Sequence, residues 1–506
     1  MISQLNPTAT AVFVVFFGLV TVLGFVASRW KAGDLTQLHE WGLGGRRFGP
    51  WITWFLIGGD LYTAYTLIAV PGAVYARGAF GFFALPYTII VYPFLFLVFP
   101  RLWQVTHKKG YLTAGDFVLG RYGNKWLELA VALTGILATM PYIALQLVGI
   151  EKAVAGLGFH GEGMAAHAPL TIAFVILALY TYHSGIRAPA MIAFVKDIMV
   201  YIFILAAVTI IPAQLGGYGA VFDAAGAALA KKGPGFGLTL TPAQVMPYIT
   251  LAIGSAMALL LYPHSLTGIL SASSTDTLKR NAAMLPAYSF LLGLIGLLGI
   301  VAYAAGIDTK DANNVVPLLI LKSFPDWFAG FCFAAIAIGA LVPAAVMSIG
   351  AANTFTRNVW KPFVNPNMTP AEETFLAKMV SLVVKVGALA VILFVPTKNA
   401  IDLQLLGGVW MIQVFPTVIF GLYTRWFNGW ALFSGWAVGM ALATGLSYSP
   451  TAWVNTYALA PGYSAYNGFI AVAVNIAIAV ALSAVWRSDA PDETRAGDYL
   501  DVPARA

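Results

Sequence analysis

Apolar segments of about 20 residues recur along almost the entire chain and are separated by short polar connections. An α-helix of that length spans the hydrocarbon core of a bilayer, and it satisfies its own backbone hydrogen bonds there. The pattern therefore predicts an all-α membrane protein. We expect thirteen transmembrane helices near residues 8–28, 51–76, 81–100, 126–154, 169–184, 188–212, 244–270, 283–305, 328–356, 376–396, 400–424, 429–448 and 465–486.

The composition agrees with this class of protein. Hydrophobic residues make up 59% of the chain and charged residues 10%, whereas a soluble domain has about 25% charged residues. The net charge of +7 need not indicate a nucleic-acid partner, because membrane proteins hold excess Lys and Arg on the cytoplasmic side, and we expect no such partner. We find no phosphate loop, metal-ligand cluster or catalytic triad, and we expect neither an enzyme nor a protein with a cofactor or bound metal.

The distribution of positive charge predicts the orientation. Most of the 28 Lys and Arg fall in segments that are cytoplasmic if the N-terminus lies outside and the C-terminus inside. The first apolar run lacks the basic start and cleavage site of a secretory signal, so we expect a retained helix. The longest outward loop is 213–243, and the polar tail at 488–506 is expected to be flexible.

Two predicted helices are interrupted at corresponding places. The second contains Gly58-Gly59-Asp60 and Pro71-Gly72, and the seventh contains Gly254-Ser255 and Pro263-His264. They lie five helices apart, the offset of an inverted five-helix repeat. Glycine and proline are common in membrane helices, but a matched pair of breaks favours a substrate or ion site near the midplane.

Five segments carry a resemblance to a known family. They read "LGGRRFGP", "TAYTLIAVPGAVYARG", "PYIALQLVGIEK", "YTYHSGIRAP" and "YPHSLTG". In this order they resemble the sodium:solute symporter family, and within it the bacterial monocarboxylate permease branch. The resemblance implies a transporter in the bacterial inner membrane that takes up lactate, pyruvate and related short acids. It also implies the inverted-repeat transporter fold with one extra N-terminal helix.

With that fold the chain divides into a transporter domain, 1–487, and a cytoplasmic tail, 488–506. Within the domain we expect an extra helix at 8–28, a first repeat at 51–212, a second repeat at 244–424 and peripheral helices at 429–486.

The resemblance breaks down at the expected sodium ligands. Sodium-coupled members carry a hydroxyl-rich pair on the ninth helix, where this chain has Val342 and Pro343. Neither side chain offers the oxygen that a hard cation requires. Ser348 and Thr354 are the alternatives if the alignment is shifted. An acidic sodium ligand on the sixth helix of several members is replaced by Ala193.

Lys196 and Asp197 follow Ala193 by about one turn, inside the apolar stretch "IAFVKDIMVYIFI". A charge at the bilayer centre costs at least ~2.5–3.5 kcal/mol. Because adjacent helix residues point about 100° apart, we expect each to need its own partner. We interpret the Lys196 ammonium as a substitute for the missing sodium and as the proton-coupling group. The other roles considered are binding of the substrate carboxylate and a structural ion pair, for example with Asp60.

Asp60 is interpreted as a proton carrier or a partner of Lys196, with capping of a half-helix as the alternative. Lys385 lies deep in the tenth helix, and its only suggested role is to snorkel toward the cytoplasm.

A small anion would suit the positive end of a half-helix, with hydroxyls and amides for specificity. The alternative role of His264 is a structural hydrogen bond, and the alternative role of the aromatic Trp410 is packing. The substrate-site candidates are Tyr62, Thr63, Tyr65, Thr66, Tyr142, Gln146, Ser255, Tyr262, His264, Gln404, Trp410 and Gln413.

The sequence thus predicts a symporter that imports short monocarboxylates, with alanine as a further substrate, and that is coupled to protons. The alternative is a sodium-coupled symporter of the same substrates or of another small solute such as an amino acid.

Overall fold

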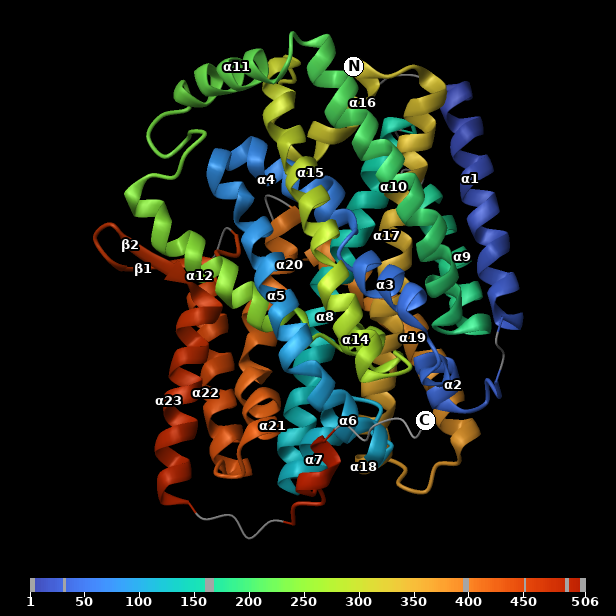
Figure 1. Ribbon diagram of the computed structural model, residues 1–506, viewed down its shortest axis with the longest axis vertical. Helices are drawn as coiled ribbons and strands as arrows, with labels where there is room; N and C mark the ends of the chain where they lie inside the picture. The colour runs from blue at the N-terminus through green and yellow to red at the C-terminus, as the bar shows by residue number, and fades with distance from the viewer. Residues whose placement is uncertain are drawn as a thin grey trace.

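The computed structural model describes residues 5–30, 33–159, 168–394, 400–449, 452–486 and 491–500. These residues form a bundle of helices with one small β-hairpin (Figure 1). The main helices are α1 (Pro7–Val26), α2 (Leu38–Leu43), α3 (Pro50–Gly59), α4 (Val70–Arg77), α5 (Ala84–Leu97), α6 (Phe99–Lys109), α7 (Ala114–Tyr122), α8 (Lys125–Gly156), α9 (Ala168–Ser184), α10 (Arg187–Gln214), α11 (Tyr218–Ala230), α12 (Pro242–Leu259), α13 (Pro263–Leu270), α14 (Thr275–Met284), α15 (Pro286–Ala304), α16 (Val315–Ser323), α17 (Asp326–Phe355), α18 (Lys361–Phe363), α19 (Pro370–Phe394), α20 (Ala400–Met411), α21 (Gly421–Tyr423), α22 (Gly429–Ser447) and α23 (Asn467–Val485).

Every segment predicted to be a transmembrane helix contains helix in the structure. Among the described residues, ten helical stretches are long and apolar enough to cross a membrane. The prediction of a multi-pass helical membrane protein is therefore confirmed.

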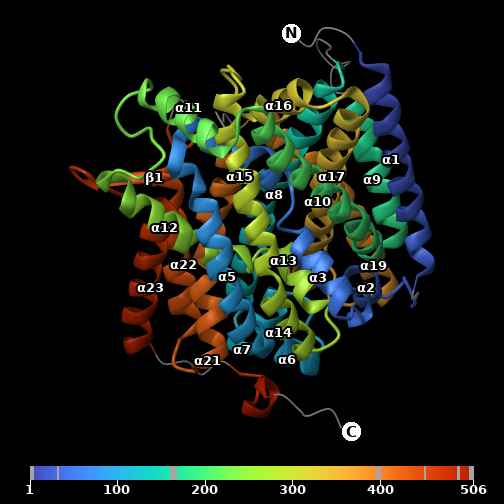
Figure 2. The same ribbon diagram turned by 45° about the horizontal axis from the view of Figure 1, so that its top comes forward.

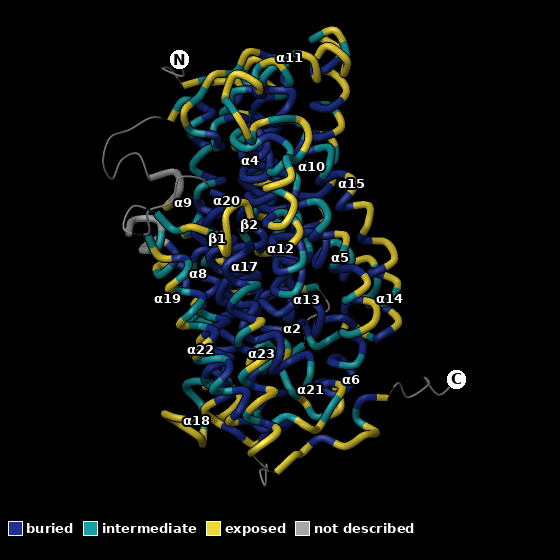
Figure 3. Tube along the Cα trace, turned by 90° about the vertical axis from the view of Figure 1, so that its left-hand side faces the viewer, coloured by how far each residue is buried: buried dark blue, intermediate teal, exposed yellow. Residues whose placement is uncertain are grey.

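Helix α17 forms the centre of the bundle. It packs against α1, α8, α10, α13 and α19, and all its residues from Ala329 to Thr354 are buried. A helix that is apolar on every side is stable only where other helices cover it. Helices α1 and α23 lie at opposite edges in Figure 1, and buried residues concentrate in the middle of the bundle in Figure 3.

Both predicted breaks are present. Helix α3 ends at Gly59, and a π-helical turn, η3 (Tyr65–Ala69), leads into α4 after a short non-helical segment. Helix α12 ends at Leu259, and α13 begins at Pro263, whose fixed φ and missing N–H suit the first position of a helix. Gly58-Gly59 and Pro263 therefore mark the two breaks, whereas Gly254-Ser255 lies inside α12 and Pro71-Gly72 lies inside α4, so these two predicted interruptions are wrong.

Two polar connections differ from expectation. The loop 213–243 contains α11, which lies across one end of the bundle (Figures 1 and 2). The tail was predicted to be flexible, but residues 491–500 lie against the bundle and include a short helical turn, η10 (Ala496–Tyr499). The prediction was wrong because polar composition alone does not reveal a binding surface elsewhere in the chain. Strands β1 (Thr456–Ala460) and β2 (Tyr463–Tyr466) pair antiparallel between α22 and α23.

The packing of α1 on α17 can be tested at Gly330. A Cβ there would lie 2.2 Å from the Ala9 carbonyl oxygen of α1, so Gly330→Ala forces the helices apart. We expect a loss of about 1–3 kcal/mol in the free energy of unfolding, the usual range for overpacking. The readout is the thermal unfolding midpoint in detergent. Gly18→Ala is the control, because a Cβ there meets nothing within 4 Å. Equal midpoints for the two variants would contradict this packing.

Candidate functional site

The two broken helices meet inside the bundle. Ser265 in the first turn of α13 donates a hydrogen bond from its Oγ to Oδ2 of Asp60, at 3.0 Å. Nε2 of His264 lies 3.5 Å from the same carboxylate oxygen. Asp60 directly follows the last residue of α3 and caps that helix, and its N–H donates to the Leu56 and Gly58 carbonyls. The carboxylate of one break therefore faces the N-terminal end of the half-helix of the other, where negative charge is favoured.

Lys196 of α10 reaches the first break. Its Nζ donates to the carbonyl oxygens of Gly59 at 2.6 Å and Tyr62 at 3.1 Å. The third contact is with Oδ1 of Asp197 at 3.0 Å, and both side chains are 0% exposed. A lysine ammonium has three N–H donors, and here each has one oxygen within reach. The ammonium thus occupies a site formed by three oxygens.

The structure corrects the expectation that Lys196 and Asp197 have separate partners. Among the described residues it also lacks the suggested ion pair between Lys196 and Asp60. Lys196 and Asp197 do contact each other, although adjacent Cβ atoms point in different directions. The four-carbon lysine stem is long enough to fold back toward the neighbouring carboxylate. Within the described residues, Asp60 makes its contacts with α13 and not with Lys196.

The sequence analysis missed Tyr288 of α15. Its hydroxyl donates to Oδ2 of Asp197 at 2.5 Å. Its ring lies 4.4 Å from that of Tyr62 and 6.2 Å from that of Tyr201, measured between centroids. Tyr288 sits in an otherwise apolar helix distant in sequence, so no local pattern pointed to it. It is the hydrogen-bond donor on the far side of the buried ion pair.

The three positions expected to replace sodium ligands are apolar and buried. A Cβ built on Gly59 would lie 2.9 Å from the Lys196 Nζ and 3.6 Å from the Ala193 Cβ, so Ala193 borders the ammonium. Val342 and Pro343 are buried in α17.

The two alternative hydroxyls on α17 hydrogen-bond within their own helix. Ser348 donates to the Ala345 carbonyl at 2.8 Å, and Thr354 donates to the Gly350 carbonyl at 2.9 Å. No group of three or more His, Cys, Asp or Glu side chains in the described part of the chain is placed to hold a metal ion.

Several substrate-site candidates stabilise the first break. Gln146 of α8 accepts a hydrogen bond from the Ala64 N–H at 3.0 Å, and Thr63 Oγ1 accepts one from the Tyr65 N–H at 3.0 Å. The Thr66 hydroxyl donates to the Leu61 carbonyl, and the Tyr62 hydroxyl donates to the Tyr288 carbonyl at 3.3 Å. These contacts satisfy backbone groups that an unbroken helix would pair internally.

A second group of candidates has unsatisfied polar atoms. The rings of Tyr142, Tyr262 and His264 form a cluster with centroid separations of 5.2 to 5.6 Å. Buried polar atoms normally have hydrogen-bond partners. A buried polar atom without a partner in the protein therefore indicates a position where a water or a ligand binds. Within the described residues no hydrogen-bond partner is present for Asp60 Oδ1, the Tyr65 and Tyr262 hydroxyls, Ser255 Oγ, both His264 ring nitrogens and Gln404 Oε1.

A small cavity borders this group. It has a volume of about 20 Å³, and Asp60, His264 and Ser265 supply its polar lining. That volume holds about one water molecule. The cavity is therefore a candidate water position between the two breaks.

The two remaining candidates contact other parts of the bundle, whereas the buried Lys385 bonds within its own helix. The Trp410 indole donates to Thr444 Oγ1 of α22 at 3.1 Å. Gln413 donates to the carbonyl of Gly468 in α23 at 3.3 Å and interacts with Asn475 of the same helix. Lys385, buried in α19, donates to the carbonyl of Ser381 in its own helix at 3.0 Å.

A bundle of membrane-length helices with two touching breaks and a buried ion pair is the architecture of a secondary transporter. The sequence pattern that defines the sodium:solute symporter family matches residues 41–439. The chain belongs to that family.

Known relatives cover nearly the whole chain. A "Monocarboxylate transport permease protein" of Rhizobium johnstonii is 57% identical over 495 residues, which is 97% of this chain and 99% of that protein. An uncharacterized symporter of Bacillus subtilis is 34% identical over 429 residues, which is 83% of this chain and 84% of the relative.

A solved structure has the same fold. It is the substrate-bound outward-open state of a Na⁺-coupled sialic acid symporter, with a TM-score of 0.75 and 13% identity. The match covers 96% of this chain and 98% of that one.

The contact between Tyr288 and Asp197 can be tested by Tyr288→Phe. The change removes a hydrogen bond to a buried charged group, so we expect the free energy of unfolding to fall by about 1.5–3 kcal/mol. Thermal unfolding in detergent measures it. Tyr180→Phe is the matched control, since the buried Tyr180 hydroxyl has no hydrogen-bond partner among the described residues. A larger loss at Tyr180 than at Tyr288 would contradict the assignment.

Proposed function

We propose that this protein is a proton-coupled symporter that imports short monocarboxylates across the bacterial inner membrane. The proposed arrangement has thirteen transmembrane helices, two inverted five-helix repeats, an outside N-terminus and a cytoplasmic C-terminus. Lactate and pyruvate are the leading substrates, with alanine as a further one. Membership of a solute symporter family and the 57% identity to a protein named as a monocarboxylate permease support this proposal.

The coupling proposal depends on one observation, the position of the Lys196 ammonium. It is bound by two carbonyls of the first break and by the Asp197 carboxylate. Carbonyl and carboxylate oxygens at a broken helix are the ligands that sodium takes in this kind of transporter. A protonated lysine supplies the same unit charge from within the chain. Protonation from outside would hold the break together, and loss of the proton inward would act as ion release.

The substrate is assigned to other residues than Lys196. Two donors of this ammonium bind carbonyl oxygens, and its charge is paired with the Asp197 carboxylate 3.0 Å away. The unsatisfied groups around the breaks, Ser255, Tyr262 and His264, are better placed to bind a small polar solute. The first turn of α13 adds a helix N-terminus that favours a carboxylate. Asp60 would then act as a second protonatable group that links the substrate region to the break.

The competing proposal keeps the substrates and replaces the proton by sodium. Hydroxyl oxygens of Ser348 or Thr354, together with backbone carbonyls, would be the ligands. The family name favours this reading, whereas Val342, Pro343 and Ala193 lack side-chain oxygens.

Uptake into proteoliposomes separates the two proposals. We expect labelled pyruvate and lactate to accumulate when the exterior is acidic and sodium is absent, because protonation of Lys196 supplies the coupling charge. An imposed sodium gradient at equal pH should give no accumulation above passive entry. Accumulation that requires sodium would overturn proton coupling while leaving the substrate assignment intact.

Lys196→Met tests the coupling residue itself. The variant keeps the stem length but has no proton to exchange, so we expect pH-driven accumulation to be lost. Labelled pyruvate uptake with and without a pH gradient is the measurement. Lys385→Met is the matched control, because Lys385 is also buried but, among the described residues, donates a hydrogen bond only to a carbonyl of its own helix. Accumulation by Lys196→Met that still follows the pH gradient would exclude this role, and thermal unfolding verifies that both variants fold.

A further inference from the structure

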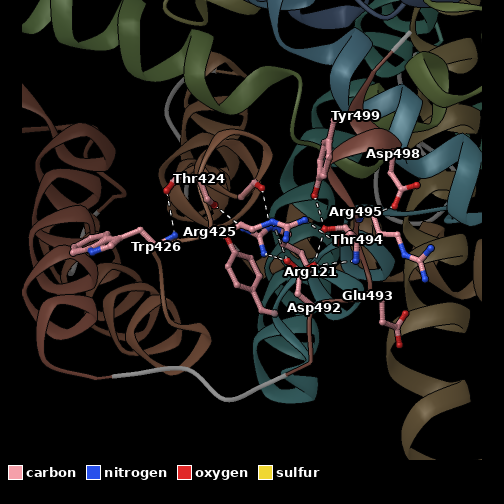
Figure 4. Close-up of polar contacts among 12 residues, drawn as sticks. Arg121, Thr424, Arg425, Trp426, Asp492, Glu493, Thr494, Arg495, Asp498 and Tyr499 are labelled. Atoms are coloured by element: carbon pink, nitrogen blue, oxygen red, sulfur yellow. Dashed lines mark hydrogen bonds and ion pairs between the residues drawn. The ribbon is translucent and has the colours of Figure 1, made fainter. Parts of the chain in front are cut away.

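The C-terminal segment 491–500 is held at one end of the bundle by five basic side chains, of which Figure 4 labels Arg121 and Arg425. We propose that these side chains form a docking surface for the chain's own tail, and that the docked tail restrains the helix ends that it connects. This surface is Arg101, Lys108 and Lys109 of α6, Arg121 of α7 and Arg425 after α21. The inference is independent of the coupling ion and of the substrate.

Arg121 is the central contact. Its guanidinium binds Oδ2 of Asp492 at 2.6 Å and donates to the carbonyls of Gly421 at 3.0 Å and Thr424 at 2.7 Å. The side chain is only 5% exposed. One buried cation from α7 therefore joins the tail to the segment that follows α21.

Arg425 and the backbone extend this contact along the tail. Arg425 donates to the Thr494 carbonyl at 2.8 Å, and its Nε lies 3.4 Å from the Asp492 carboxylate. The N–H of Glu493 donates to the Gly120 carbonyl at 2.8 Å. The register of the tail is therefore set by main-chain as well as side-chain bonds.

The two lysines of α6 bind the rest of the segment. Lys108 donates to the carbonyls of Gly497 at 2.7 Å and Leu500 at 2.9 Å. Lys109 donates to the Glu493 carbonyl at 2.6 Å and pairs with Asp498 at 3.3 Å. Although partial burial opposes it, the Arg495 N–H and Lys109 lower the pKa of Asp498. Neutral pH lies well above this lowered pKa, so the Asp498 carboxylate is ionised there. We therefore expect small pH changes near neutrality to leave the Lys109–Asp498 ion pair intact.

The tail also has a folded shape of its own. Asp492 Oδ1 accepts hydrogen bonds from the N–H and the hydroxyl of Thr494, and the Tyr499 hydroxyl donates to Thr494 Oγ1 at 2.9 Å. Thr494 is 2% and Tyr499 7% exposed. The Arg101 guanidinium lies 4.9 Å from the Tyr499 ring centroid and 5.1 Å from that of Tyr423. Residues this buried define a specific site, not a chance surface contact.

The docked tail connects distant parts of the chain. Helices α6 and α7 follow the first broken helix, whereas Gly421, Thr424 and Arg425 follow α20, beyond the second break. A movement that separates these two ends must break the Arg121 and Arg425 contacts. Among the other contacts, Arg425–Asp492 and Lys109–Asp498 are partly exposed charge pairs, which salt weakens. The proposed release of the tail also breaks the hydrogen bonds to the carbonyls of Glu493, Thr494, Gly497 and Leu500.

Spin-label distances in the full-length chain test the docking. Labels at Gly445→Cys and Gly497→Cys suit this purpose, because a side chain at either position meets nothing within 4 Å. The natural Cys332 is fully buried and is changed to Ala. We expect one narrow distance distribution that broadens in Asp492→Asn/Asp498→Asn and in Arg121→Gln/Arg425→Gln. Thermal unfolding verifies that the tail variant folds, and Arg280→Gln is the control, because Arg280 pairs with Asp276 of its own helix.

A broad distribution in the starting protein, or a narrow one in both paired variants, would overturn the docking surface. The restraint has its own readout, the maximal rate of labelled pyruvate uptake into proteoliposomes. We expect the tail variant to raise this rate without a change in KM, since the helix ends separate more readily. An unchanged maximal rate with an undocked tail would overturn the restraint, whereas absence of uptake in every protein would count against the substrate proposal alone.

Discussion

The structure depends on how the first broken helix is satisfied inside a membrane. Breaking a helix leaves backbone carbonyls without partners, and hydrocarbon offers no water to replace them. Here the Lys196 ammonium binds the Gly59 and Tyr62 carbonyls, while Gln146 and Thr63 bind the N–H groups that follow. The buried charge and the broken backbone thus satisfy each other's polar groups.

The second break is tied to the first through Asp60. Its carboxylate lies at the first turn of α13, in contact with Ser265 and close to His264. A change in protonation at either break therefore alters a contact with the other. This connection gives a physical route between the ion pair on α10 and the unsatisfied polar groups of α12 and α13.

The sequence was sufficient to predict the helices, both breaks and a buried charge at Lys196. Those features depend on local composition: apolar length, glycine and proline positions, and a charge in an apolar run. Three features could not be predicted. The Lys196–Asp197 contact depends on a side-chain conformation, Tyr288 reaches Asp197 from a helix 91 residues away, and the tail site needs cations from three separate elements. Each is a tertiary contact without a periodic pattern in the sequence.

The neutral ion pair has an electrical consequence. With Lys196 protonated and Asp197 ionised, the pair adds no net charge to the hydrocarbon region. In the proposed proton-coupled cycle, a monocarboxylate that binds beside the pair brings one negative charge, so the pair and substrate together carry one negative charge. After the proton and the substrate leave inward, Asp197 remains ionised, and the empty carrier bears one negative charge as well. The membrane potential acts on a moving charge with about 2.3 kcal/mol per 100 mV, but one proton moves with each anion, so the complete proposed cycle is electroneutral and the potential does not drive accumulation.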